Sequence, residues 1–445
     1  MTTEQVVEAD LTWTGQALET GIQVVIGSDG RIARVGSLGL EPSRRLSGRA
    51  LLPGFVNAHS HAFLRGLGGG GRGERFPMGA GTFWTWRDAM YGLVDRLEAS
   101  SFLAVNIRAF REMRTAGITT VGEFHYLHHR EPLDFAFDRL VLQAAREAGI
   151  RLVLLTTFFK TGRIGQPLRN AQRRFATPSV EGYWAELDAL SSEANPRFAT
   201  VGAVVHSVRA ATPDDLAAIH AEALRRGLPF HIHVEEQRRE VEHCLEAYGS
   251  TPMRLLLDRV ESARNITAIH CTQTFPNDRN AFLEQGGRIC VCPLTEANLG
   301  DGLPTLEDVP SDRLCLGTDS NARIDMVEEA RWLEYGQRLR RQERGALRDQ
   351  EGQVARVLLR AATAGGAASL GVPAGRIEPD AWADFLVLDL GHPSLAEVEP
   401  EGLVDAWLFG GGSDAIVGTC VGGEWSAGLE DSGTQGLKDS RTQRS

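Results

Sequence analysis

The feature that most limits the possible folds is an alternation, from about residue 54, of short apolar runs with longer helical stretches. Alternation of this kind is typical of parallel β/α units, and eight strands separated by helices predict a (β/α)8 TIM-like barrel. The eight runs are Phe55–His61, Ile118–His125, Arg151–Phe158, Thr200–His206, Pro229–Glu235, Ile266–Cys271, Arg288–Pro293 and Leu314–Asp319.

Strand-like segments also flank the predicted barrel. Ile22–Ile26 and Arg31–Val35 surround an Asp-Gly turn, which predicts a β-hairpin. Further strands are expected at 383–389 and 414–419. The expected division is a small β domain from 1–50 and 366–427, a catalytic barrel over 51–365, and a disordered polar tail over 428–445.

Composition narrows the class of partner. The chain has 445 residues, of which 42% are hydrophobic, and a net charge of -11. An acidic chain without a basic block predicts that nucleic acid and membranes are not partners. No apolar stretch reaches membrane-spanning length and the N-terminus lacks signal-peptide features, so we expect a cytoplasmic protein.

The six cysteines lie mostly within apolar runs, which favours reduced thiols in the core over a disulfide framework. Cys290 and Cys292 are spaced like half of a metal site. No second cysteine pair completes it, so the core interpretation is favoured.

Polar residues gather at the C-terminal ends of the apolar runs, the end at which a barrel places its active site. They are His59, His61, Glu123, His125, His206, His233, Glu236, His270 and Asp319. For any one of them alone, a hydrogen-bonded core role is the alternative interpretation. Their recurrence on strand after strand predicts a site.

A metal centre is the most specific prediction. Residues two apart on a strand point to the same face, so His59 and His61 converge on one point. His231 shares the face of His233, and we prefer His233 because it lies nearer the strand's end. Three imidazoles and one carboxylate suit a single Zn²⁺ per subunit. The candidate ligands are His59, His61, His233 and Asp319.

Bound zinc would lower the pKa of a water molecule and so provide a nucleophile. Glu236, three residues past His233, is a candidate general acid and base, and Glu235 is its rival. Either glutamate could instead be a solvated loop charge. His270 and Asp319 are candidates to accept the proton of the water.

Taken together, these residues resemble the amidohydrolase superfamily in its mononuclear deaminase branch. More specific segments resemble formimidoylglutamate deiminases, also called N-formimino-L-glutamate iminohydrolases. The resemblance extends over about residues 50–390. The specific segments are 83–91, 123–126, 206–209, 295–302 and 332–338, of which 83–91 and 295–302 are the most discriminating.

The resemblance implies hydrolysis of N-formimino-L-glutamate to N-formyl-L-glutamate and ammonia in histidine degradation. It assigns Arg87, Tyr126 and Arg209 to the two substrate carboxylates and places His206 in the pocket lining. Arginine forks suit carboxylates, so an acidic protein can bind this small acidic substrate. Surface charge is the alternative for each arginine, and packed barrel residues for Tyr126 and His206. A homodimer is a further expectation from the resemblance.

The chain departs from the family pattern at three places. Leu64 stands where the family can carry glutamine, Gln273 where some members have a second histidine, and 68–73 is unusually rich in glycine. These departures bear on substrate contacts more than on the metal ligands.

The hypothesis for the reaction is attack of activated water on the formimino carbon. Glu236 protonates the leaving nitrogen, while His270 and Asp319 position and deprotonate the water. One alternative is deamination of a purine, pterin or guanidine compound. Another, from a different class, is a non-catalytic binding protein on the same barrel.

Overall fold

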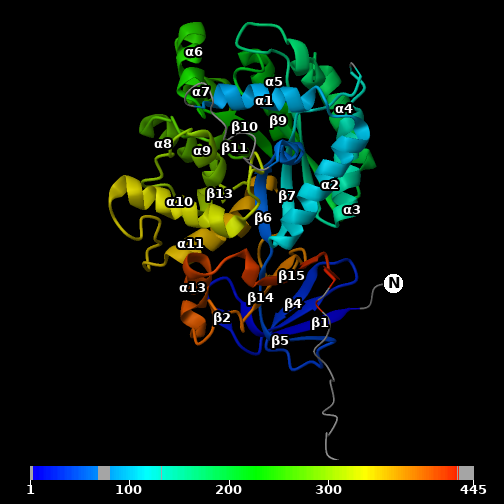
Figure 1. Ribbon diagram of the computed structural model, residues 1–445, viewed down its shortest axis with the longest axis vertical. Helices are drawn as coiled ribbons and strands as arrows, with labels where there is room; N and C mark the ends of the chain where they lie inside the picture. Colours follow the sequence, from blue (N-terminus) through cyan, green and yellow to red (C-terminus); the bar gives the residue numbers. More distant parts are fainter. Residues whose placement is uncertain (1–3, 69–80, 132, 428, 430–445) are drawn as a thin grey trace, which may run out of the picture.

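The computed structural model describes residues 4–427 and 429, except 69–80 and 132. It consists of an eight-stranded parallel barrel surrounded by helices and a separate sheet below it (Figure 1). In the separate sheet, strands from the start of the chain lie beside strands from its end. The expected fold class, a (β/α)8 barrel with a small β domain from both termini, is confirmed.

The barrel strands are β6 (Phe55–Ser60), β7 (Ile118–His125), β8 (Arg151–Phe158), β9 (Ala199–Val205), β10 (Phe230–Val234), β11 (Ile266–His270), β12 (Arg288–Val291) and β13 (Leu314–Leu316). The small-domain strands are β1 (Gln5–Trp13), β2 (Leu18–Glu19), β3 (Gln23–Ile26), β4 (Ile32–Gly36), β5 (Arg44–Pro53), β14 (Phe385–Asp389), β15 (Ile416–Val421) and β16 (Glu424–Trp425). The α-helices are α1 (Phe83–Val94), α2 (Ala99–Thr115), α3 (Ala136–Ala148), α4 (Val180–Glu193), α5 (Pro213–Arg226), α6 (Arg238–Tyr248), α7 (Pro252–Arg259), α8 (Pro276–Glu284), α9 (Pro293–Leu299), α10 (Met326–Arg341), α11 (Val354–Arg360), α12 (Gly366–Leu370) and α13 (Leu403–Gly410).

The barrel closes between its first and last strands. Neighbouring strands pair in chain order from β6 to β13, and a parallel bridge between Ser60 and Asp319 joins the two ends. Around this bridge, His61 N–H donates to the Asp319 carbonyl at 2.8 Å, and Asp319 N–H donates to the His59 carbonyl at 3.0 Å. This contact between the first and last strands, the seam of the barrel, therefore joins two polar segments that are 260 residues apart in the chain.

Some strands end earlier than the sequence predicts. The expected run Leu314–Asp319 is a strand only as far as Leu316, and the expected run Ile266–Cys271 ends at His270. The φ angles of Asp319 and His270 are +41° and +75°. Left-handed backbone cannot continue a strand, and outside glycine it is a strained conformation that recurs at functional sites.

The small sheet has the order β16-β15-β14-β5-β1-β3-β4, with β2 beside β1. The expected hairpin is present as β3 and β4. β15 starts at Ile416 rather than at the expected Asp414, because Ser413–Ala415 forms a 3-10 turn. Since β5 ends at Pro53 and β6 starts at Phe55, this sheet lies at the N-terminal end of the barrel, opposite the end expected to carry the site.

A buried ion pair joins the two parts. Arg151, the first residue of β8, donates through Nε and Nη2 to the two carboxylate oxygens of Asp384, at 2.7 and 2.9 Å. The Asp384 carboxylate also accepts Gly422 N–H at 2.7 Å. Bidentate arginine–carboxylate pairs fix geometry as well as contributing energy, so this pair sets how the small sheet joins the barrel.

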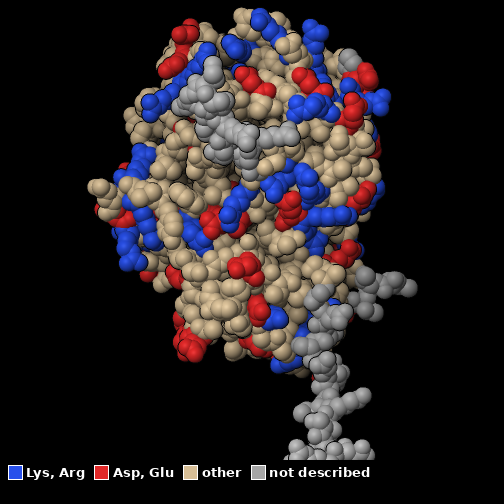
Figure 2. Space-filling view, in the orientation of Figure 1, with Lys and Arg blue, Asp and Glu red and all other residues tan. Residues whose placement is uncertain are grey.

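Other expectations concern composition. All six cysteines are buried and free. Within the described part of the chain, no helix is both long enough and apolar enough to cross a bilayer. Positive and negative side chains are interspersed over the face shown in Figure 2. Of the expected tail, only Leu429 belongs to the described residues, and it is buried against the small sheet. Of the glycine-rich stretch, only Gly68 does.

Candidate metal centre and catalytic pocket

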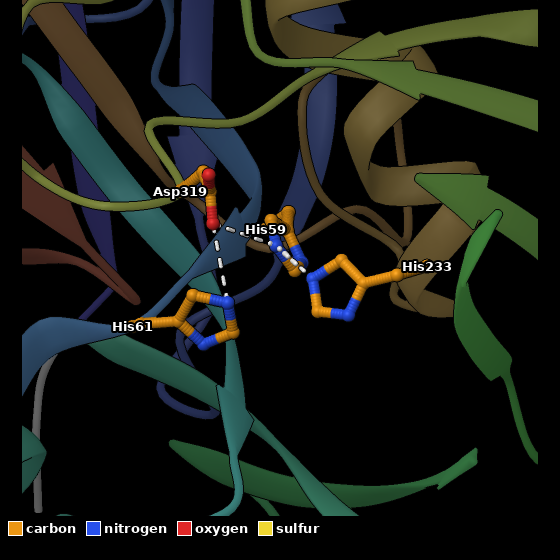
Figure 3. A group of neighbouring side chains, drawn as sticks. All are labelled: His59, His61, His233 and Asp319. Atoms are coloured by element: carbon orange, nitrogen blue, oxygen red, sulfur yellow. Dashed lines mark hydrogen bonds and ion pairs between the residues drawn. The ribbon is translucent and has the colours of Figure 1, made fainter. Parts of the chain in front are cut away.

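Four buried side chains converge at the C-terminal end of the barrel (Figure 3). His59 Nε2 and His61 Nε2 each lie 3.1 Å from Asp319 Oδ1, and His233 Nε2 lies 3.2 Å from His59 Nε2. One donor atom from each residue falls within 4.8 Å of the others. We call His59, His61, His233 and Asp319 the metal group.

Backbone carbonyls orient two of the imidazoles. His61 Nδ1–H donates to the Phe124 carbonyl at 2.7 Å, and His233 Nδ1–H donates to the His206 carbonyl at 3.0 Å. Neutral imidazole carries one N–H, so each of these rings presents the lone pair of Nε2 to the centre of the group.

This arrangement fits a metal ion. The Nε2 lone pair of His61 faces a carboxylate oxygen of Asp319 at 3.1 Å, and two acceptors at that distance repel each other unless a cation lies between them. Burial lowers the pKa of His59 to about 3, which keeps that imidazole neutral, as metal binding requires. Burial would raise the pKa of Asp319, but the neighbouring imidazoles of His59 and His61 hold it well below its usual range.

A cavity opens onto the metal group. His61, His233 and Asp319 form part of its wall, so the ion site faces the space in which a substrate can lie. All the other residues predicted for catalysis or substrate binding share the same cavity. They are Arg87, Tyr126, His206, Arg209, Glu236 and His270.

Two proton-carrying groups stand beside the metal group. His270 Nε2 lies 3.9 Å from Glu236 Oε1. Burial raises the pKa of Glu236, although His270 and Arg209 oppose this. Burial would lower the pKa of His270, but the carboxylates of Glu236, Glu296 and Asp319 raise it to about 10. The pair can therefore hold and exchange a proton at neutral pH.

The sequence could not decide between Glu235 and Glu236 as the catalytic acid, or between His231 and His233 as the metal ligand. The structure decides both cases. Glu235 turns away from the cavity, and its Oε1 accepts Met253 N–H at 2.9 Å at the start of α7. Glu236 lines the cavity. His231 shares a strand face with His233, but its ring bonds to the Ser369 carbonyl at 2.9 Å, apart from the metal group.

The guanidinium of Arg87, on α1, lies 4.4 Å from the Trp84 ring centroid and has no carboxylate partner among the described residues. Its Nε is buried and lacks a hydrogen-bond partner in the same set. Burial lowers the pKa of Arg87, as do the neighbouring cations Arg209 and Arg163. A negatively charged ligand would relieve that repulsion.

Arg209 is positioned by its neighbours. Its Nε donates to Ser207 Oγ at 3.2 Å, and its guanidinium lies 3.7 Å from Glu236 and 3.6 Å from Glu240. Tyr126 is buried beside His206, with ring centroids 5.5 Å apart. His206 thus lines the cavity with its ring while its backbone carbonyl holds His233.

The two single-residue departures from the family pattern lie outside the described lining of the cavity. The side chain of Leu64 is buried in the hydrophobic core. Gln273 Nε2 donates to the Asp301 carbonyl at 2.6 Å, which fixes the loop after α9. Leu64 therefore contributes to core packing, and Gln273 to the position of the loop.

Sequence reasoning missed several groups. Backbone carbonyls such as that of Phe124 have no sequence signature. Glu123 was noted as a strand-end residue, and it accepts Ala62 N–H at 2.6 Å, which fixes the segment after His61. Two further sets have donors close enough for a metal, namely His125, His128 and Asp138, and His270, Cys292 and Glu296. Glu296 lies in a segment singled out for its resemblance, but its contact with His270 required the fold.

Fold and site together define the class. Residues 50–426 match the amidohydrolase family, and the chain belongs to that family. It is therefore a metal-dependent hydrolase, as the sequence predicted.

Comparison with individual proteins shows more specific similarity. The chain is 38% identical to formimidoylglutamate deiminase from Pseudomonas aeruginosa, over 91% of this chain and 90% of that protein. It is 31% identical to a crystal structure of an amidohydrolase from Brucella melitensis, with a TM-score of 0.83 and coverage of 95% and 94%. An adenosine deaminase from Xanthomonas campestris, crystallised with bound zinc, shares the fold at 21% identity and a TM-score of 0.77, with coverage of 94% and 92%. The predicted resemblance is confirmed.

Proposed function

We propose that this chain hydrolyses N-formimino-L-glutamate to N-formyl-L-glutamate and ammonia, a step of histidine degradation. The observation that carries the proposal is one cavity that joins the metal group to Arg87, a partly buried cation without a carboxylate partner among the described residues. The similarity to the Pseudomonas aeruginosa deiminase over most of both chains supports it.

We further propose that the metal group holds one zinc ion per chain. Three imidazoles and one carboxylate are a donor set that suits zinc. When bound, zinc lowers the pKa of water and so supplies a nucleophile at neutral pH. His61 and His233 would bind through Nε2, because backbone carbonyls occupy their Nδ1–H groups.

The residues around the metal group move the protons. His270, which its neighbouring carboxylates keep protonated at neutral pH, orients the attacking water, and the Asp319 carboxylate accepts one proton of the water as the new C–O bond forms at the formimino carbon. Glu236 delivers one proton to the terminal nitrogen. As the C–N bond breaks and the new hydroxyl becomes the formyl C=O, the remaining proton of the water passes to the same nitrogen, ammonia leaves, and the proton held by Asp319 returns to Glu236. The raised pKa of Glu236 suits this donation, because a carboxyl that stays protonated nearer neutrality is the better acid.

Arg87, Arg209 and Tyr126 hold the two carboxylates of the substrate. Arginine forks bind carboxylates through two parallel hydrogen bonds, which fix orientation as well as charge. Binding at Arg209 would also draw that cation away from Glu236, now 3.7 Å from it, and leave the Glu236 carboxyl free for proton transfer.

The test is ammonia release from N-formimino-L-glutamate by zinc-loaded wild type, Glu236→Gln and Glu235→Gln. We expect wild type and Glu235→Gln to be active, and Glu236→Gln to lose about 10²- to 10⁴-fold in rate, the range for a lost general acid. Adenosine serves as a comparison substrate. Turnover of adenosine and none of the formimino compound would discard the substrate while keeping the hydrolase.

Oligomeric state and compartment remain predictions from the sequence, a homodimer and the cytoplasm. Light scattering of the purified protein tests the first, and fractionation of the source cells tests the second.

A further inference from the structure

A buried carboxylate stands behind His270, on the side of the ring away from Glu236. Glu296 Oε1 lies 3.2 Å from His270 Nδ1, whereas the other ring nitrogen, Nε2, lies 3.9 Å from Glu236 Oε1. Both His270 and Glu296 are 1% exposed. The imidazole is therefore held between two carboxylates, and only Glu236 belongs to the cavity wall.

The position of Glu296 is fixed by short-range contacts with the residues just before and just after α9. Its Oε1 also accepts Cys292 N–H at 2.9 Å, and its backbone carbonyl accepts Asp301 N–H at 2.9 Å. Its second oxygen, Oε2, is buried and has no hydrogen-bond partner among the described residues. Burying a carboxylate is costly unless it is paired, so the bond to His270 is its main electrostatic compensation.

His270 needs such an anchor. The residue is the last of β11 and has a φ of +75°. The bond from Cys271 N–H to the Val234 carbonyl, at 3.1 Å, holds the backbone beyond it, but a backbone bond does not fix which ring nitrogen faces the cavity. Its ring stacks on His233 with centroids 5.5 Å apart and planes 10° apart, and stacking of two faces does not distinguish Nδ1 from Nε2. A flip would turn Nδ1 toward the cavity and Nε2 away from it.

We propose that Glu296 is a positioning residue that accepts the Nδ1–H of His270 and so keeps Nε2 facing the substrate and Glu236. The logic is that of an imidazole whose far nitrogen is fixed by a carboxylate, so that its near nitrogen is aimed at the reacting atoms. Glu296 lies outside the described cavity lining, so it acts through His270. The inference rests on the proposed function, in which His270 orients the attacking water.

Glu329 provides a matched control. It is a second fully buried glutamate of the same region, and its Oε2 accepts Leu294 N–H at 2.9 Å at the start of α9. The hydrogen bonds of the structure connect it to the helix but not to His270. Glu329→Gln therefore replaces a buried carboxyl group next to α9 without touching the imidazole.

The kinetic arm compares wild type, Glu296→Gln and Glu329→Gln, each with its zinc content measured. We expect Glu296→Gln to lower kcat about 10- to 100-fold with KM and zinc content unchanged, the range for lost partners that orient functional side chains. Glu329→Gln should keep kcat within about twofold. Equal kcat in Glu296→Gln and Glu329→Gln would overturn the proposal. So would a second zinc ion in wild type that Glu296→Gln loses, because Glu296 would then be a ligand.

The spectroscopic arm needs no substrate. In zinc-loaded protein labelled with ¹⁵N-histidine, we expect the His270 signals of wild type and Glu329→Gln to show a protonated, hydrogen-bonded Nδ1, and those of Glu296→Gln to be shifted or split. Unchanged signals would refute the role of Glu296 even if N-formimino-L-glutamate proves not to be the substrate. Should Glu296→Gln fail to fold, Glu296→Leu fills a similar volume without polar atoms and replaces it in both arms.

Discussion

Replacing Arg87 by methionine tests how the acidic protein binds a dianionic substrate. The Arg87 guanidinium has no carboxylate partner among the described residues, and its Nε is buried without a hydrogen-bond acceptor. In the complex it would gain a bidentate, charge-assisted pair. Removing one member of such a pair costs about 2–4 kcal/mol. At 1.36 kcal/mol per tenfold change, Arg87→Met should lower kcat/KM about 30- to 1000-fold.

The assay is initial-rate ammonia release with N-formimino-L-glutamate and with a formamidine that lacks carboxylates. We expect Arg87→Met to lose activity on the first substrate and to keep its rate on the second. Arg87→Lys keeps the charge without the fork and should lose less, about tenfold. A kcat/KM for Arg87→Met within about threefold of wild type on N-formimino-L-glutamate would refute the reasoning.

The effect of Arg87→Met on thermal stability can also be predicted. Burial and two neighbouring arginines destabilise the Arg87 cation in the free protein. Its removal should therefore leave the melting temperature unchanged or raise it. A large fall in melting temperature would mean that the loss of activity reflects misfolding.

Three further predictions concern the buried charges. Asp384→Ala leaves Arg151 buried without its partner and should lower the free energy of unfolding by about 3–5 kcal/mol in a denaturant titration, and a change below about 1 kcal/mol would contradict this. Burial raises the pKa of Glu235 to about 7, so the stability from its protonated form is complete below about pH 4.5 and is lost as pH rises through about 7. Glu235→Gln should therefore melt at a higher temperature than wild type at pH 8 and at about the same temperature at pH 4, and the reverse order would count against burial as the cause. Chelation should lower the melting temperature, and one equivalent of zinc should restore it in wild type but not in Asp319→Asn. Equal thermal shifts in both proteins would remove Asp319 from the metal group.

The fold was predictable from periodicity because each barrel strand is a short apolar run buried on both faces. β7 and β8 begin and end where the runs predicted. β13 did not follow its run: it ends at Leu316, and Asp319 beyond it has a left-handed conformation. The backbone hydrogen bonds that hold Asp319 come from His59 and His61, which are distant in sequence.

The convergence of the metal group was also predictable in part. His59 lies at the end of β6 and His61 directly follows that strand, and barrel topology places strand ends at one edge. Spacing could not separate His231 from His233, because both occupy the same face. The Ser369 carbonyl makes the distinction, and it comes from a helix 138 residues further along.

The orientation of the imidazoles could not be predicted from the sequence. Backbone carbonyls of Phe124 and His206 decide which nitrogen of His61 and of His233 is free, and carbonyls are common to every residue. Glu296 could be named from the sequence but not assigned, because its contact with His270 joins positions 26 residues apart on different strand–helix units.

The most direct test of the central claim is a ¹H NMR time course of N-formimino-L-glutamate with zinc-loaded protein and with protein stripped of metal. The account predicts that the formimino proton signal of the substrate is replaced by the formyl proton signal of N-formyl-L-glutamate, with one ammonia released per turnover, only when zinc is bound. An unchanged substrate spectrum in the zinc-loaded sample, or the same rate without metal, would contradict it.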